Sequence, residues 1–248
     1  MTTTQGQVIG LTEMPLPIIE RFLRERDGVW QQISLEVQLN SLIAQMLVNS
    51  TVALAFYGAV MGFSQSIPQA IASAIKLPIL FLLTLAICLP TLYLFNLLFG
   101  GRLSARQVLA LALSAITVTS ALTLAFAPIS LFFLVTAPSY LFFILLNVTI
   151  LTLTAAVGLG FLVEGTQSVN TLVNEGLNGP AVENAPPRRP MNPSLLHIWL
   201  LLYSFVGTQL GWTLRPFFGI RGDDFTLFRD IEGNFYSAII QSFFSLFF

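Results

Sequence analysis

Charged residues are scarce in this chain of 248 residues. Aspartate, glutamate, lysine and arginine together make up 9% of it, and 55% of its residues are hydrophobic. A soluble domain carries about a quarter charged residues, so this chain cannot cover a compact soluble fold with polar surface. The net charge of −1 also offers no basic surface for nucleic acid. The composition therefore predicts a membrane protein whose apolar surface contacts lipid, with no nucleic-acid partner.

Reactive side chains are equally rare. Cys88 is the single cysteine, which excludes an intramolecular disulfide and makes a metal cluster implausible. The single histidine, His197, could ligate a chlorophyll or haem iron, or it could be an ordinary interfacial helix residue. No second histidine, cysteine or carboxylate lies at metal-ligand spacing from it. We therefore predict no metal and no cofactor, while contact with lipid or pigment remains open.

The same scarcity argues against catalysis. A hydrolytic site needs a nucleophile, a base and an orienting group, and no acidic residue lies inside an apolar segment. We predict that the protein is not an enzyme. A lipid-acting enzyme that uses His197 or Glu164 is the third and weakest hypothesis.

Long apolar segments dominate what is present. Five of them approach the roughly 20 residues that cross a bilayer as a helix. We expect an all-α polytopic bundle of about five transmembrane helices, with an N-terminal amphipathic helix and a short C-terminal apolar helix. Pro90 and Pro128 should kink the second and third spans. The predicted spans are residues 44–63, 77–99, 108 to beyond 133, 140–163 and 195–214.

Four regions follow from these segments. Residues 1–43 hold a polar start and the amphipathic helix, and residues 44–163 hold four spans. Residues 164–194 are rich in asparagine, glycine and proline, which predicts an exposed loop that serves as a linker or a docking segment. Residues 195–248 hold the fifth span and an apolar tail of about 15 residues, which is short for a span. The first ten residues lack the pattern of a cleavable signal peptide.

The segment "PLPIIERFLRERDGVW" predicts the amphipathic helix. Its apolar residues fall on one helical face and its charged residues largely elsewhere. We expect Gly28 to end this helix and Trp30 to lie at headgroup level. An ordinary amphipathic helix packed on protein explains the pattern equally well. The apolar face comprises Ile18, Ile19, Phe22 and Leu23.

Basic residues near the helix ends predict the orientation, because cytoplasmic loops carry more of them. With a cytoplasmic N-terminus, seven arginines lie inside and four basic residues outside. The inner set is Arg21, Arg24, Arg26, Arg102, Arg106, Arg188 and Arg189, and the outer set is Lys76, Arg215, Arg221 and Arg229.

The cores of the predicted spans contain only neutral polar groups. These side chains could form hydrogen bonds between helices or line a path for a neutral solute. In the turn "FGGRLSARQ", Ser104 and Gln107 have the spacing of a helix capping box. The polar groups are Asn49, Ser50, Thr51, Thr84, Asn96, Ser114, Thr117, Thr119, Asn147, Thr149 and Thr152.

The stretch "GTQLGWTLRP" in the fifth span is the strongest packing motif that we find. Gly207 and Gly211 form GxxxG, which lets another helix approach closely. Ser204 and Arg215 continue the same face, and Trp212 marks the depth of the helix end. The arginine could extend to the membrane boundary, or it could cap helix carbonyls or pair with Asp223 or Asp224. We predict a helix-packing or interface face of Ser204, Gly207, Gly211, Trp212 and Arg215.

Two blocks of sequence resemble an uncharacterised group of bacterial multi-span membrane proteins that includes members from photosynthetic bacteria. They are residues 76–133, with a lysine–proline entry, a mid-helix proline and the glycine hairpin, and "LLLYSFVGTQLGWTLRPFFG". The first block is also distantly similar to the Yip family of five-helix membrane proteins. The resemblance implies a bacterial inner membrane or a thylakoid membrane, and no catalytic residues.

These observations lead to two main hypotheses of function. The first is a non-enzymatic accessory, assembly or scaffolding subunit that packs against other membrane proteins or itself, for example in a photosynthetic or other large membrane complex. The second is a small-solute transporter or channel that uses the polar helix residues and the proline kinks.

Overall fold

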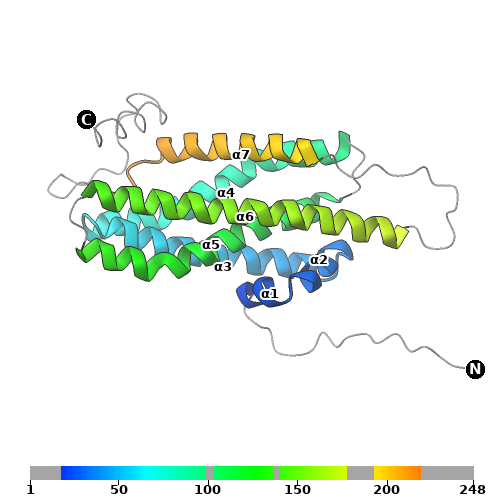
Figure 1. The fold of residues 1–248 in the computed structure, drawn as a ribbon, viewed down its shortest axis with the longest axis horizontal. Helices are drawn as coiled ribbons and strands as arrows, with labels where there is room; N and C mark the ends of the chain where they lie inside the picture. Colours follow the sequence, from blue (N-terminus) through cyan, green and yellow to red (C-terminus); the bar gives the residue numbers. More distant parts are fainter. Residues whose placement is uncertain (1–17, 99–102, 137–139, 178–192, 219–248) are drawn as a thin grey trace, which may run out of the picture.

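The computed structural model describes residues 18–98, 103–136, 140–177 and 193–218 (Figure 1). Within these ranges the chain is helical and has no strand, which confirms the predicted all-α class. Five long helices run along the long axis of the molecule, and two short helices lie against one end. In chain order the helices are α1 (Ile18–Arg24), α2 (Arg26–Ser34), α3 (Leu39–Gly62), α4 (Ile67–Leu98), α5 (Ala105–Thr136), α6 (Tyr140–Leu177) and α7 (Pro193–Thr213).

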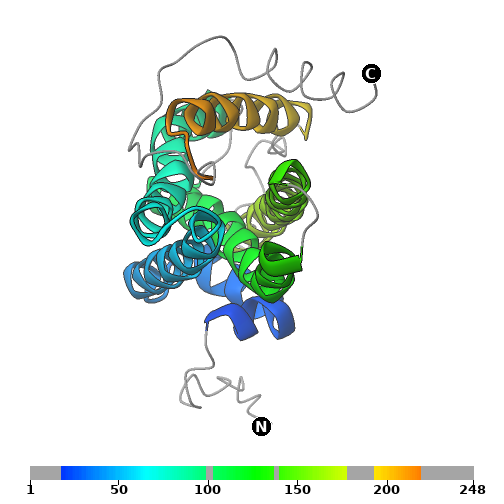
Figure 2. The same ribbon diagram turned by 90° about the vertical axis from the view of Figure 1, so that its left-hand side faces the viewer.

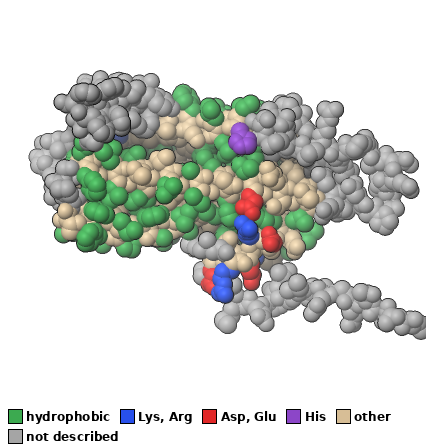
Figure 3. Space-filling view, in the orientation of Figure 1, with side chains coloured by type: hydrophobic (Ala, Val, Ile, Leu, Met, Phe, Trp, Pro, Cys, Tyr) green, Lys and Arg blue, Asp and Glu red, His purple; other side chains and the backbone are tan. Residues whose placement is uncertain are grey.

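Four of these helices, α3 to α6, are long and apolar enough to cross a membrane. Large hydrophobic side chains are exposed along α3, α4 and the first half of α6 and at the C-terminal end of α5, as expected for surfaces that contact lipid. The face shown in Figure 3 is mostly apolar, and its charged side chains gather around α1 and α2. The fold is therefore that of a helical membrane protein with four helices of spanning length.

Helix α5 forms the centre of the bundle. It packs against α3, α4 and α6, and the end-on view shows it between α3 and α6 (Figure 2). Residues 111–120 are ten consecutive buried positions. A helix that is buried on every side must be surrounded by other helices. Small and hydroxyl-bearing residues fill this stretch, which allows its neighbours to come close.

The N-terminal segment forms two helices in place of the single predicted one. Glu25 leaves the helical conformation with φ −131° and ψ 42°, and α2 begins directly after it. The prediction that Gly28 ends a helix is wrong, because Gly28 lies in the first turn of α2. The Phe22 and Trp30 side chains are buried and pack with Phe161 of α6. These contacts place the segment against α6, and its position at the membrane interface stays a prediction.

Helix α6 is longer than expected. It continues through 38 residues to Leu177, so the predicted loop at 164–194 is wrong for residues 164–177. The polar composition of this stretch is overridden by packing. Gly165 lies directly against the Trp30 indole, and Glu164 forms an ion pair of 2.9 Å with Arg26. Residues 178–192, the rest of that loop, lie outside the described residues.

Helix α4 also begins earlier than the predicted span, at Ile67 and not near residue 77. Ten residues assigned to a connection, including Lys76, therefore belong to the helix. Both α4 and α5 continue as single helices through their internal prolines, Pro78, Pro90 and Pro128. The expected apolar tail, together with Asp223 and Asp224, falls outside the described residues.

The turn between α4 and α5 carries the predicted capping box. The Ser104 amide donates to the Gln107 side-chain oxygen at 2.8 Å, and the Gln107 amide donates to the Ser104 hydroxyl at 3.2 Å. This reciprocal pair confirms the prediction. The side-chain NH₂ group of Gln107 also donates to the backbone carbonyls of Ile33 and Ser34, which fixes α2 to the start of α5.

Candidate functional site

A polar stripe lies on the N-terminal half of α4. Gln69, Ser73 and Lys76 are spaced four and three residues apart, so they share one helix face. All three are buried although they belong to an apolar helix. An ionisable residue buried in a span is by default a candidate functional residue. The structure therefore directs attention to this end of the bundle.

The stripe contacts the segment that follows α7. The Gln69 amide donates to the Pro216 carbonyl at 2.9 Å, and the Lys76 ammonium approaches the same oxygen at 3.4 Å. The Ser73 hydroxyl donates to the Phe217 carbonyl at 2.6 Å. Carbonyls at and beyond a helix end lack helical donors, and leaving them unpaired in a membrane is costly. Helix α4 supplies the missing donors.

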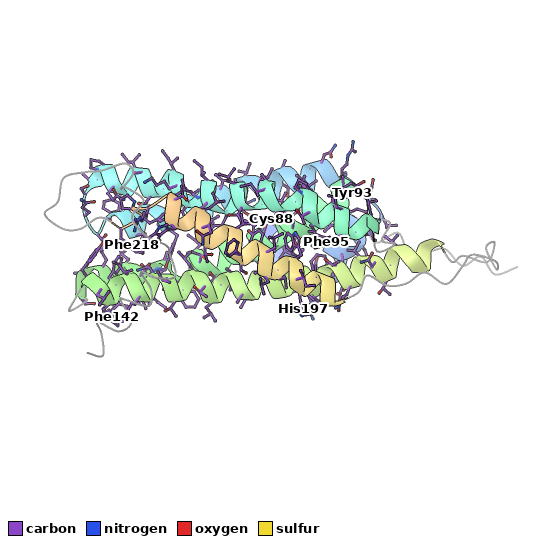
Figure 4. The ribbon with its side chains drawn as sticks, turned by 90° about the horizontal axis from the view of Figure 1, so that it is seen from above. Cys88, Tyr93, Phe95, Phe142, His197 and Phe218 are labelled. Atoms are coloured by element: carbon purple, nitrogen blue, oxygen red, sulfur yellow. The ribbon has the colours of Figure 1, made fainter. Side chains whose placement is uncertain are left out.

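The same segment reaches across to α6. The Phe218 ring meets the Phe143 ring edge to face, with centroids 5.9 Å apart. Figure 4 shows Phe218 between the helices of the bundle, and Figure 2 shows the chain turning inward after α7. We call residues 214–218 the strap, because they join the end of α7 to both α4 and α6.

Arg215 contacts the aromatic ring of a residue in the last turn of α7. Its predicted partners Asp223 and Asp224 lie outside the described residues, so the arrangements considered from the sequence stay predictions. The Arg215 guanidinium stacks on the Trp212 ring, with the central carbon 3.6 Å from the ring centroid. This is a cation–π contact within one helix end. The carbonyls nearby are capped from α4, chiefly by Gln69 and Ser73. Arg215 and Trp212 therefore form a local pair at the start of the strap.

The two glycines of the predicted packing face point towards α4 of the same bundle. A Cβ atom on Gly207 would lie 3.5 Å from the Thr84 methyl group, and one on Gly211 would lie 4.0 Å from the Leu80 methyl groups. Both are ordinary van der Waals distances. Ser204 is exposed and does not share this buried contact. The five predicted residues are thus divided between the contact of Gly207 and Gly211 with α4, the exposed Ser204, and the pair of Trp212 and Arg215 at the end of α7.

A second GxxxG pair, which sequence reasoning did not single out, makes closer contacts than the pair in α7. Gly58 and Gly62 of α3, in "GAVMG", also form GxxxG, and both press on the backbone of α4. A Cβ atom on Gly62 would lie 2.6 Å from the Ala70 Cα atom, and one on Gly58 would collide with the Ser73 carbonyl. The motif is visible in the sequence, but its partner is not, because the polar residues of 67–76 do not predict the start of α4.

A buried hydrogen-bonded cluster joins three helices near the strap. The Asn147 side-chain oxygen accepts from the Tyr57 hydroxyl at 2.7 Å and from the Ser130 hydroxyl at 2.6 Å. The Asn147 amide donates to the Phe143 carbonyl of its own helix. The cluster joins α3, α5 and α6. Its member on α5, Ser130, lies two residues after Pro128. Of its members, only Asn147 was singled out from the sequence.

Most other polar side chains in the spans form hydrogen bonds within their own helices. The Asn49, Thr51 and Thr84 side chains donate to carbonyls four residues earlier in their own helices. Two hydroxyl pairs cross between helices, Ser50 with Thr117 at 3.2 Å and Thr123 with Thr154 at 2.9 Å. In the described residues these polar groups therefore take part in packing, within a helix or between two helices.

Two hollows between the helices are small. The larger hollow, between α4, α5, α6 and α7, has a volume of about 20 Å³, and a second has about 10 Å³. A cavity needs roughly 10–15 Å³ to hold one water molecule. Neither His197 nor Glu164 lines either hollow. His197 is on the surface of α7 (Figures 3 and 4).

The polar end presents hydrogen-bond donors to carbonyl groups. Among the described residues its charged side chains are Lys76 and Arg215, while the acidic side chains whose burial is described are Glu20, Glu25, Asp27, Glu36 and Glu164. No group of three histidine, cysteine or acidic residues in these ranges could hold a metal ion. The arrangement is suited to fixing helices in place.

No protein-family model, no curated protein and no solved structure matches this chain.

Proposed function

We propose that this protein is a non-enzymatic accessory, assembly or scaffolding subunit that packs against other membrane proteins. It has five spans, with α7 as the fifth and the N-terminus in the cytoplasm. The proposal places it in a bacterial inner membrane or a thylakoid membrane, as part of a larger complex. Lipids and other integral membrane proteins are its partners.

The observation that carries this proposal is the position of α7. The helix packs mainly along α4, and its opposite face is open. Four large hydrophobic residues on that face, spaced i, i+3, i+4 and i+7, form a stripe typical of helix–helix contacts. Leu201 at its centre is 72% exposed. We call this set the α7 outer stripe: Ile198, Leu201, Leu202 and Phe205.

The interior of the bundle supports the same proposal. Its buried hydroxyl and amide groups bond mainly to their own helices or to a neighbouring helix, and the hollows among the described residues hold about one water molecule each. A protein whose interior is filled by packing contributes through its outer surface.

The test is site-specific photo-cross-linking in native membranes. A photoreactive residue at Leu201 should capture a second membrane protein, which purification and mass spectrometry then identify together with bound pigments. The same residue at Val52, which is exposed on α3, is the matched control and should capture mainly lipid. Capture of only lipid at Leu201, together with a monodisperse monomer in mild detergent, would contradict the proposal.

A second candidate function is transport of a small solute. Buried Lys76 favours it, because ionisable residues inside spans often mark solute or ion pathways. Reconstituted vesicles should then show a flux of some solute that is lost in Lys76→Met and kept in Arg106→Met, an exposed control. Absence of flux across ions, sugars, amino acids and other neutral solutes would exclude it.

A further inference from the structure

The strap carries most of the described side-chain hydrogen bonds between α4 and the chain of α7. Along α7, Gly207 and Gly211 meet α4 at ordinary contact distances, and the Trp199 indole donates to the Cys88 carbonyl at 3.1 Å. At the strap, donors from one face of α4 reach the carbonyls of Pro216 and Phe217. Of the four side-chain hydrogen bonds that the structure describes between α4 and residues 193–218, three therefore lie at the C-terminal end and one at Trp199.

The other helices are held differently. Gly58 and Gly62 bring α3 against the backbone of α4 with no space for a methyl group. Gly158 of α6 is equally close to the Ala115 carbonyl of α5, where a Cβ atom would lie at 2.5 Å. Helices joined by such backbone contacts separate only when the whole bundle opens. Regions with fewer buried contacts open locally at lower free energy.

We propose that the strap, residues 214–218, is a latch. Its docking on Gln69, Ser73 and Lys76 keeps α7 on the bundle, and its release frees α7 while α3 to α6 stay packed. The donors are suited to this role because they are fully or almost fully buried and preformed on one helix face. When the strap leaves, α4 exposes a hydrogen-bonding stripe and the inner face of α7 becomes accessible. This inference does not depend on the proposed function.

The mechanism of release is the exchange of three protein hydrogen bonds for bonds to water at the end of the bundle. The ring contact between Phe218 and Phe143 is lost in the same step. The step breaks no covalent bond. Any change that weakens one donor therefore raises the population of the released form and leaves the tight glycine contacts between α3 and α4 unchanged.

Hydrogen–deuterium exchange of the full chain in detergent tests the latch. In Ser73→Ala and in Lys76→Met, amide exchange in residues 193–213 should rise about tenfold, as expected for the loss of one buried hydrogen bond. Exchange in residues 107–120 of α5 should stay unchanged. The matched control is Ser120→Ala, since the Ser120 hydroxyl is buried and bonds only to the Thr117 carbonyl of its own helix.

Three results would overturn the latch. Exchange that rises equally in α5 and α7 would show that the stripe stabilises the whole bundle. Exchange in α7 that is unchanged in both variants would show that the strap does not hold the helix. Exchange in wild-type α7 at the rate of an unstructured peptide would show that the helix is not docked in solution.

Discussion

At the scale of single residues, the buried polar side chains have two different structural roles. Gln69, Ser73 and Lys76 cap carbonyls of another element, whereas Asn147 joins hydroxyl groups from two neighbouring helices. Hydrogen bonds between membrane helices typically contribute about 0.6 kcal/mol and at most about 2 kcal/mol. A residue that forms hydrogen bonds to two buried partners at once should contribute a free energy near the upper end of this range.

Asn147→Leu should therefore destabilise the protein by about 1–3 kcal/mol, because it leaves the buried Tyr57 and Ser130 hydroxyl groups without their acceptor. Asn49→Leu is the control, since the Asn49 amide bonds only to the Gln45 carbonyl of its own helix, and it should change stability by less than about 0.5 kcal/mol. The measurement is thermal or denaturant unfolding in detergent. Equal effects of the two variants would show that the cluster contributes no more than an ordinary helix residue.

At the scale of helices, two GxxxG pairs differ in how closely their partner approaches. Gly58 and Gly62 touch the α4 backbone, which cannot move without shifting the helix. Gly207 and Gly211 face the ends of side chains, which can rotate. The motif alone does not distinguish these cases, because the distance depends on the residues that the partner helix presents.

Gly62→Ala should destabilise the bundle by about 1–3 kcal/mol through overpacking, and Gly58→Ala should do the same. Gly211→Ala should be nearly neutral because its methyl group has space. Gly160→Ala is the control, since nothing lies within 4 Å of that position. Unfolding in detergent measures all four. If Gly211→Ala costs as much as Gly62→Ala, the contact between α4 and α7 is tighter than the structure shows.

Larger side chains at Gly207 or Gly211 should weaken the packing of α7 against α4, although a methyl group fits there. Gly207→Leu places a branched side chain against Thr84, so it should weaken the association of α7 with α4 more than Arg215→Lys does. Lysine at position 215 keeps a cation near the Trp212 ring, although it lacks the planar group that stacks there. Equal tolerance of both changes would leave Arg215 and the glycines with no packing role.

At the scale of the whole molecule, the order of helices sets the topology. The α1–α2 pair, the start of α5 and the overhanging end of α6 lie at one end of the bundle, and the strap and the start of α4 lie at the other. A 38-residue helix is about 57 Å long, well beyond the roughly 30 Å of the hydrocarbon core. The extra length of α6 supports α2.

Single cysteines in a Cys88→Ser background should report this topology in sealed vesicles. Positions Gly28 and Ala105 should react with an impermeant maleimide from one side, and Gln65 and Thr213 from the other, because each spanning helix changes the side. The cysteine-free parent is the control. Reaction of Thr213 from the side of Gly28 would show that α7 does not span.

The sequence by itself determined the features that depend on local composition. Scarce charge and long apolar runs required membrane helices, and the spacing of Ser104 and Gln107 required a cap, because each signal is contained in a short stretch of chain. Helix boundaries were less certain. The start of α4 and the end of α6 contain polar residues that are helical only because Trp30, Gly62 and the strap pack against them.

Only the tertiary structure decided which polar and glycine residues matter. Lys76 reads as a boundary residue in sequence, but it is buried because the carbonyl of Pro216, 140 residues later, lies beside it. Gly58 and Gly207 have the same motif, yet one meets a backbone and the other a methyl group. Such differences arise from partners that are distant in sequence, so no local pattern contains them.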